Sequence, residues 1–129
     1  MLDIEDFKSS LRDFLLADTG VSGSVSARIY FTNFFTLINP TFPLINLELF
    51  EGRNIVQAVD RIGVNVFCSS KVSYDEADSI FTLTNSLINT GLIKPKIVCR
   101  LQITPINRLI EKPIPIYQTI GRYTMFYIN

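Results

Sequence analysis

The sequence of 129 residues predicts an α+β fold, in which an antiparallel or mixed sheet of about four to five strands carries two helices on one face. The first reason is the order of the expected elements: a helix, three strands, a second helix and two strands. The second reason is the spacing of apolar residues, which is three to four in the helices and two in the strands. A chain of this length suits one hydrophobic core. We therefore treat residues 1–129 as a single domain.

The first helix is expected to begin after Asp3, a potential N-cap, and to end near Asp18. Its apolar residues recur at spacings that place them on one face: Ile4, Phe7, Leu11, Phe14 and Leu15. The sequence VSGS then predicts a flexible turn, and SARIYF predicts a short strand.

The segment FTNFFTLINPTFP, residues 31–43, contains four phenylalanines and two prolines but no charge. Proline removes a backbone donor, so we expect a protruding loop rather than a helix or a central strand. We expect its apolar residues to contact a neighbouring subunit or another protein: Phe31, Phe34, Phe35, Leu37, Ile38 and Phe42. The alternative is that these phenylalanines belong to the core of the subunit itself.

A hairpin is expected after Pro43, with LINLELFEG as one strand, a turn at Gly52 and RNIVQAVDRIGVNVFCSS as a second, long strand. Near the end of this strand, apolar residues alternate with other residues as in a half-buried sheet. The expected core residues there are Ile62, Val64, Val66 and Cys68.

The second helix is predicted by a capping box at Ser73 and Glu76, with Val72 as a hydrophobic staple against Ala77 and Gly91 as the stop. The expected core stripe is Ala77, Ile80, Phe81, Thr84, Leu87 and Ile88. The opposite stripe is polar but uncharged: Ser79, Thr82, Ser86 and Asn89. Depletion of charge is typical of a subunit interface, although a stripe that simply faces solvent is the alternative.

Two final strands are expected, KIVCRLQITPIN and PIYQTIGRYTMFYIN, joined by the proline-marked segment LIEKPI. In the first of them Ile97, Cys99, Leu101 and Ile103 alternate with their neighbours, as one face of a sheet requires.

The composition argues against an enzyme. No histidine is present, and the two cysteines, Cys68 and Cys99, are expected to be buried thiols rather than metal ligands or nucleophiles. The glycines form no phosphate-binding motif, and the acids Asp75, Glu76 and Asp78 are explained by the first turn of a helix. No cofactor is expected. No apolar run is long enough to span a membrane and the start resembles no signal peptide, so we expect a cytoplasmic protein without a membrane partner.

The charges are unevenly placed along the chain, although the net charge is zero. Residues 1–78 hold eleven acids and six bases, whereas residues 79–129 hold one acid and six bases. This split could make identical subunits complementary, or could be a dipolar surface without functional meaning. The six late bases are dispersed rather than clustered, but they could line a channel for DNA or complement acids of a neighbour: Lys94, Lys96, Arg100, Arg108, Lys112 and Arg122.

Several segments together resemble the tail-completion or tail-terminator proteins of long-tailed bacteriophages. They are LRDFLLAD, ARIY, FPLINLEL, IGVNVFCSS, SYDEADSIFTLTNSLI and GRYTMFYI, which span nearly the whole chain in the order of that family. Ala27 departs from the family, which often has glycine before this arginine, and the loop of residues 31–43 is unusually aromatic.

The resemblance implies a structural protein that forms a ring, commonly a hexamer, at the end of the tail tube. Such a ring ends tube polymerisation and presents a surface for the head, and DNA passes through its centre without sequence recognition. The implied partners are other copies of the chain, the tail tube protein and a head connector or neck protein. The implied location is the host cytoplasm during assembly and then the tail–neck junction of the virion. The alternatives are a neck protein between portal and tail, and a monomeric binding domain.

Overall fold

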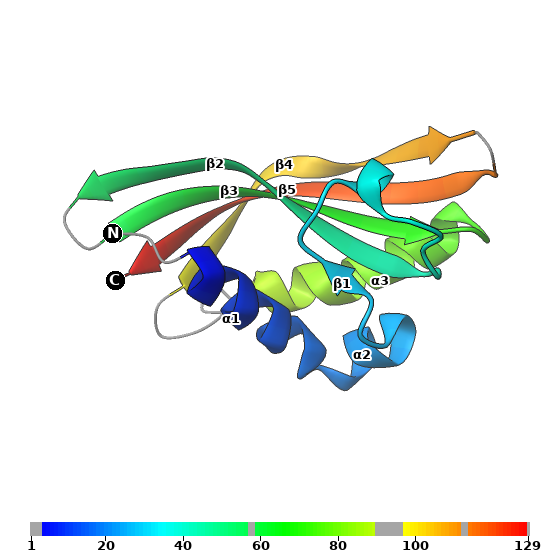
Figure 1. The fold of residues 1–129 in the computed structure, drawn as a ribbon, viewed down its shortest axis with the longest axis horizontal. Coiled ribbons are helices and arrows are strands. Elements are labelled where there is room, and N and C mark those ends of the chain that lie inside the picture. Colours follow the sequence, from blue (N-terminus) through cyan, green and yellow to red (C-terminus); the bar gives the residue numbers. More distant parts are fainter. Residues whose placement is uncertain (1–3, 57–58, 90–96, 112–113, 129) are drawn as a thin grey trace.

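The computed structural model describes residues 4–56, 59–89, 97–111 and 114–128, without the side chains of residues 51, 53–56 and 97–104. The fold is α+β, with a five-stranded mixed sheet and three α-helices, which confirms the predicted fold class (Figure 1). The elements are α1 (Ile4–Leu16), α2 (Thr19–Val25), β1 (Ile29–Tyr30), a 3-10 helix η1 (Phe34–Thr36), β2 (Leu44–Val56), β3 (Val59–Ser70), α3 (Tyr74–Ile88), β4 (Ile97–Ile110) and β5 (Ile116–Ile128).

The strands of the sheet follow the order β1-β2-β3-β5-β4. β1 runs parallel to β2, and every other pair is antiparallel. β3 and β5 pair without a register shift from Val59↔Ile128 to Ser70↔Tyr117, so they form the regular centre of the sheet. β4 is an edge strand, which is where Pro105 is tolerated, next to a register shift between Ile103 and Ile106.

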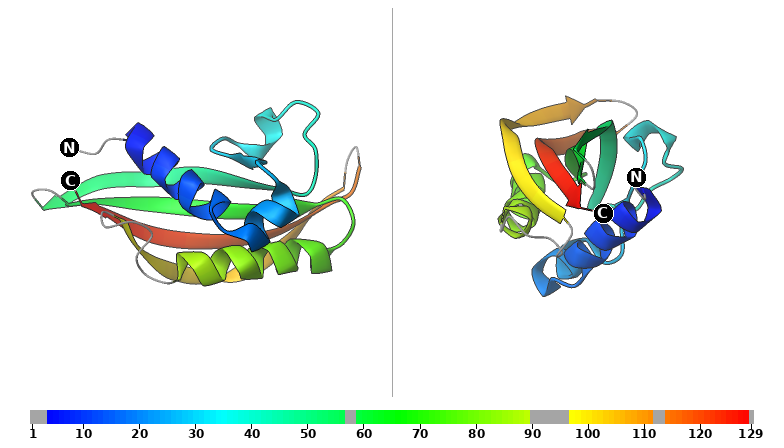
Figure 2. Two further views of the ribbon diagram at one scale, coloured as in Figure 1. Left: turned by 90° about the horizontal axis from the view of Figure 1, so that it is seen from below. Right: turned by 90° about the vertical axis from the view of Figure 1, so that its left-hand side faces the viewer.

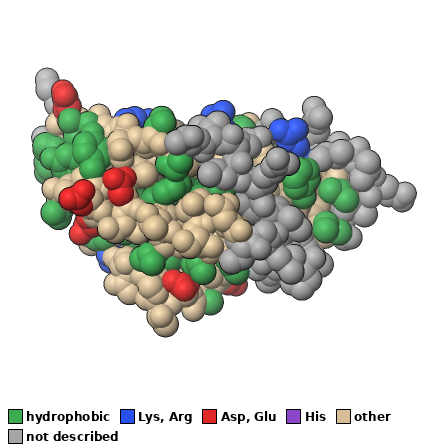
Figure 3. All heavy atoms as spheres, turned by 180° about the vertical axis from the view of Figure 1, so that it is seen from behind, with side chains coloured by type: hydrophobic (Ala, Val, Ile, Leu, Met, Phe, Trp, Pro, Cys, Tyr) green, Lys and Arg blue, Asp and Glu red, His purple; other side chains and the backbone are tan. Residues whose placement is uncertain are grey.

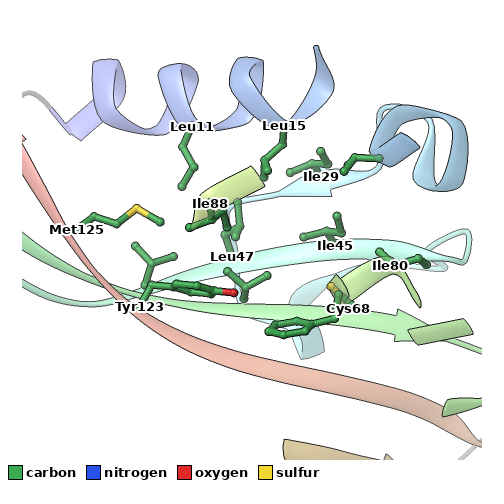
Figure 4. Packing of buried hydrophobic residues seen from close by; sticks show 14 of the residues in the cluster. Leu11, Leu15, Ile29, Ile45, Leu47, Cys68, Ile80, Ile88, Tyr123 and Met125 are labelled. Atoms are coloured by element: carbon green, nitrogen blue, oxygen red, sulfur yellow. The ribbon is translucent and has the colours of Figure 1, made fainter. Parts of the chain in front are cut away.

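The helices cover one face of the sheet, as predicted (Figures 1 and 2). The main core lies between the two layers, where Leu11 and Leu15 of α1 point toward the strands (Figure 4). The expected alternation in β3 is confirmed, because Ile62, Val64 and Val66 all belong to this core. The residues that alternate with them, Arg61, Gly63, Asn65 and Phe67, therefore face away from the helices. We call this second face the open sheet face.

The hairpin of β2 and β3 forms as predicted, but its turn lies elsewhere. Gly52 was expected at the turn, yet it pairs with Ile62 inside the sheet, and β2 continues to Val56. β2 accommodates this length through register shifts between Leu49 and Glu51 and between Asn54 and Val56. The segment of residues 53–56 thus belongs to β2 and not to the following strand.

The flexible turn predicted at VSGS was wrong, because these residues lie in α2. Asp18 caps this helix, since its Oδ2 accepts a hydrogen bond from the backbone N–H of Val21 at 2.9 Å. Val21 and Val25 are four residues apart and fully buried in the main core. Their burial outweighs the low helix propensity of the neighbouring glycines and serines. The predicted cap at Asp3 lies outside the described residues.

The start of α3 forms only part of the predicted capping box. Ser73 Oγ accepts a hydrogen bond from the backbone N–H of Glu76 at 3.1 Å. The Glu76 carboxylate instead accepts one from Ser70 Oγ at 2.7 Å, and Ser70 Oγ in turn accepts from the backbone N–H of Ser73. The predicted staple was wrong, because Val72 is 72% exposed. The core stripe of α3 is confirmed, and Gly91 lies outside the described residues.

Candidate subunit interface

The aromatic loop, residues 31–43, is a loop as predicted, and it is tied to the edge of the sheet. Asn33 Oδ1 accepts a hydrogen bond from the backbone N–H of Phe35 at 2.9 Å and so begins η1. The buried Asn46 of β2 donates from Nδ2 to the carbonyl oxygen of Thr32 at 3.2 Å. Asn33 Nδ2 also donates to Glu48 Oε1 at 3.3 Å. These bonds hold the loop in one position relative to β2.

Phe34 does not fit the expectation that it contacts another chain. It is 7% exposed and packs with Leu44 and Ile116 in a second, smaller core cluster. Phe42 and Leu37, also expected at the interface, are half-buried around this cluster. The cluster anchors the loop within its own subunit.

Phe35 and Ile38 are the residues of the aromatic loop that are most available for contact. Phe35 is 69% exposed and Ile38 is 89% exposed. Phe31, the remaining predicted contact residue, is half-buried and packs against the main core. Phe35 also lines an apolar pocket, so exposed apolar surface is concentrated at this loop, as at surfaces that bind another protein.

A pocket of about 310 Å³ lies between the aromatic loop and the end of the β4–β5 hairpin. Its apolar lining includes Phe35, Phe42 and Ile114, and the ammonium of Lys71 lies 4.8 Å from the centre of the Phe42 ring. A pocket with this lining suits an apolar side chain that is supplied by another protein chain.

The outer stripe of α3 is exposed throughout, and its residues are the predicted Ser79, Thr82, Ser86 and Asn89. Part of its hydrogen bonding is satisfied within the helix: Thr82 Oγ1 donates to the carbonyl oxygen of Asp78 at 2.9 Å, and Asn89 Nδ2 donates to Asn85 Oδ1 at 3.1 Å. Leu83, which the sequence analysis did not single out, is also exposed on this helix. This stripe can be covered without removing a charge from water.

Of the six basic residues singled out in the sequence, the structure describes the side chains of Arg108 and Arg122. These two arginines have different surroundings. Arg108 Nε donates to Gln118 Oε1 at 2.9 Å, and its guanidinium lies 5.9 Å from the Phe35 ring centre and 5.4 Å from that of Phe67. Arg108 therefore links the aromatic loop to the open sheet face. Lys94, Lys96 and Lys112 lie outside the described residues, as does the side chain of Arg100.

Arg122 is exposed on the open sheet face and belongs to a group that the sequence analysis missed. Its guanidinium lies 4.3 Å from the centre of the Phe50 ring, and its Nε donates to Asn65 Oδ1 at 3.0 Å. Phe50 is 41% exposed and covers Gly63, where a Cβ would lie only 2.4 Å from Phe50 Cζ. The sequence indicated this group only through Phe50. This apolar residue directly follows Leu49 and so does not fit the alternation of Leu47 and Leu49.

The described residues contain no group of three or more His, Cys, Asp or Glu side chains that could hold a metal ion. Cys68 is a free, fully buried thiol, as predicted, and desolvation raises its pKa far above the ordinary value. A thiol in this state is a poor nucleophile. Within the described part of the chain, no helix is long and apolar enough to cross a membrane.

Comparison with known proteins gives a likeness of fold. No family model matches the chain, and no curated protein matches it. Among solved structures, the chain is similar to a chain of the virion of the native gene transfer agent (GTA) particle, with a TM-score of 0.56 and 12% sequence identity. The match covers 95% of this chain and 94% of that chain, so the two share one fold from end to end.

Proposed function

We propose that this chain is a structural virion protein that assembles into a ring at the end of a tail tube. The ring ends polymerisation of the tube and provides the surface that joins the tail to the head. DNA passes through its central channel without being read by sequence. In this proposal the chain has no catalytic role, and its partners are other copies of itself, the tail tube protein and a head connector.

The observation that carries this proposal is the end-to-end likeness to a chain of a virion particle. The likeness extends over nearly the full length of both chains, so it concerns the whole domain rather than one shared motif. The order of sequence segments that resembles tail-terminator proteins supports the same role. A ring of six copies follows from that resemblance.

The placement of the contact surfaces agrees with a ring. Phe35 and Ile38 are exposed on the aromatic loop, beside a pocket, whereas the uncharged stripe lies on α3 in the helix layer. A ring closes when one patch of each copy binds a different patch of the next copy. Standard interfaces bury about 800 Å² on each side, which is enough to cover these apolar side chains.

The proposal is tested by deleting the gene in the phage or particle that encodes it and measuring tails by electron microscopy. We expect tails of abnormal length, or tails without heads, because nothing stops the tube or joins it to the head. Supplying the wild-type chain from a plasmid should restore normal particles. Normal-length tails joined to filled heads would refute the proposal.

The same images separate the closest alternative. Free tails of normal length beside unsealed heads would assign the chain to the neck, between portal and tail. Light scattering of the purified chain adds a second measurement. A strictly monomeric protein over a wide concentration range would favour a monomeric binding domain and would argue against a preformed ring.

A further inference from the structure

We propose that the open sheet face around Arg122 binds the outer side of α1 from a second copy of the chain. This inference rests on the proposed function, because it adds a charged contact between neighbouring copies in the ring to the apolar surface of the aromatic loop. We call the two surfaces the Arg122 patch, formed by Phe50, Arg61, Asn65 and Arg122, and the acidic stripe, formed by Glu5, Ser9, Asp13 and Ala17.

The Arg122 patch has the composition of an interface centre. The exposed guanidinium of Arg122 is stacked on Phe50 at 4.3 Å and fixed by its hydrogen bond to Asn65. Both contacts restrict the arginine before any partner arrives, so little rotamer freedom is lost on binding. Arginine and aromatic residues are enriched at the positions that contribute most to protein–protein binding. The patch therefore fits a partner that offers carboxylates.

The acidic stripe is an exposed row along α1 that ends at Ala17, the residue directly after the helix. Its four residues recur every fourth position, and all four are exposed on the side opposite the buried Phe7, Leu11 and Leu15. Serine and alanine alternate with the two carboxylates, so a partner can approach the helix closely.

Arg12, a cation of α1, is directed away from the acidic stripe. Arg12 Nε donates to the carbonyl oxygen of Ile29 at 3.1 Å, and its Nη2 donates to that of Ala27 at 3.2 Å. Asp13 lies in the last turn of α1, where the helix dipole disfavours a carboxylate and where no basic residue occurs. A cation from another copy would offset this unfavourable position.

The spacings of the charges on the two surfaces agree. Glu5 and Asp13 are eight residues apart on a helix, which corresponds to about 12 Å. Asn65 pairs with Arg122 and Arg61 pairs with Phe126, so the two arginines are four positions apart along a regular sheet, which corresponds to about 13 Å. The two spacings therefore match, with Arg122 exposed and Arg61 half-buried at the other end of the patch.

The two surfaces lie on opposite sides of the two-layer molecule, because α1 covers the face of the sheet that the Arg122 patch does not occupy (Figure 2). Viewed from behind, most of the visible Lys and Arg atoms lie along the upper edge, and most acidic side chains lie below them (Figure 3). A contact between opposite faces joins copies head to tail. Such a contact is heterologous, as a closed ring requires.

The inference is tested with Arg122→Glu, Glu5→Arg and Asp13→Arg, studied by sedimentation velocity together with the wild-type chain. All three positions are exposed, so we expect only small changes in thermal unfolding. We expect each variant alone to self-associate at least about tenfold more weakly than the wild type, since each places like charges in contact. Mixing Arg122→Glu with one of the two stripe variants should restore association. When the two variants alternate, the introduced glutamate meets the introduced arginine at one contact, and Arg122 meets the unchanged carboxylates at the next.

The charge-matched control for the stripe variants is Glu111→Arg, an exposed residue outside both surfaces that should leave association unchanged. The inference would be overturned if Arg122→Glu and both stripe variants self-associated as strongly as the wild type. It would also be overturned if the wild-type chain never self-associated. Loss of association in Glu111→Arg alone would assign the contact to the end of the β4–β5 hairpin and would also overturn the inference. The proposed function is decided separately by tail length, so either idea can fail without the other.

Discussion

At the scale of single residues, two adjacent phenylalanines of the aromatic loop have opposite environments. Phe34 is buried with Leu44 and Ile116, whereas Phe35 is largely exposed, with its ring edge-on to Phe34 at 5.6 Å. The composition of the segment predicted a loop with apolar side chains. It could not predict which side chain turns inward, because that depends on η1 and on strand residues far along the chain.

We predict that Phe34→Ala lowers the free energy of unfolding by about 3 kcal/mol, because it leaves a cavity in the second core cluster. The double change Phe35→Ser and Ile38→Ser should lower it by less than about 1 kcal/mol, because both side chains already face solvent. Urea denaturation followed by circular dichroism measures both values. If Phe35→Ser and Ile38→Ser destabilise the protein as much as Phe34→Ala, the exposed residues contribute to folding rather than to contact with other chains.

At the scale of elements, the sequence predicted correctly those helices and strands in which the spacing of apolar residues agrees with the capping or turn residues at the ends. In β3 an apolar residue occupies every second position from Ile62 to Cys68, and α3 has both a cap at Ser73 and a full apolar stripe. α2 was missed because its burial depends on Val21 and Val25, while its glycines and serines indicate a turn. The turn at Gly52 was misplaced because a glycine that pairs within a strand cannot be distinguished by sequence from one that ends it.

The candidate surfaces were only partly predictable for a related reason. The α3 stripe follows from helix periodicity, and the structure leaves all four of its residues exposed. The Arg122 patch combines residues from β2, β3 and β5, which only strand pairing brings together. A pattern within one element can be read along the chain, whereas a surface made by several strands cannot.

For α3 we predict that Ser73→Ala lowers the free energy of unfolding by about 1 kcal/mol, because the backbone N–H of Glu76 loses its partner. Ser73→Asp should retain most of the stability, since aspartate caps helices as well as serine does. Ser79→Ala is the matched control, because Ser79 is exposed within the same helix and alanine is the better helix former. Thermal unfolding of the three variants gives the comparison, and equal values for Ser73→Ala and Ser79→Ala would contradict the cap.

At the scale of the whole molecule, the fold separates exposed carboxylates of α1 and α3 from the arginines of the open sheet face. The exposed acids Glu5, Asp13 and Asp75 lie on α1 and α3, whereas Arg108 and Arg122 lie on the open sheet face. The net charge is zero, so copies do not repel one another through total charge. The orientation of two copies is then governed by where the charges lie.

This arrangement predicts that salt weakens self-association. The Debye screening length falls from about 10 Å at 0.1 M salt to about 3 Å at 1 M. The attraction between the Arg122 patch and the acidic stripe should therefore weaken over that range. We expect the association constant from sedimentation velocity to fall several-fold between 0.05 and 0.5 M sodium chloride, an order-of-magnitude expectation for exposed charge pairs. The Arg122→Glu variant, which lacks the attraction, should show a much smaller change and serves as the control. Association that strengthens with salt would instead indicate that apolar contacts, such as those of Phe35 and Ile38, hold the copies together.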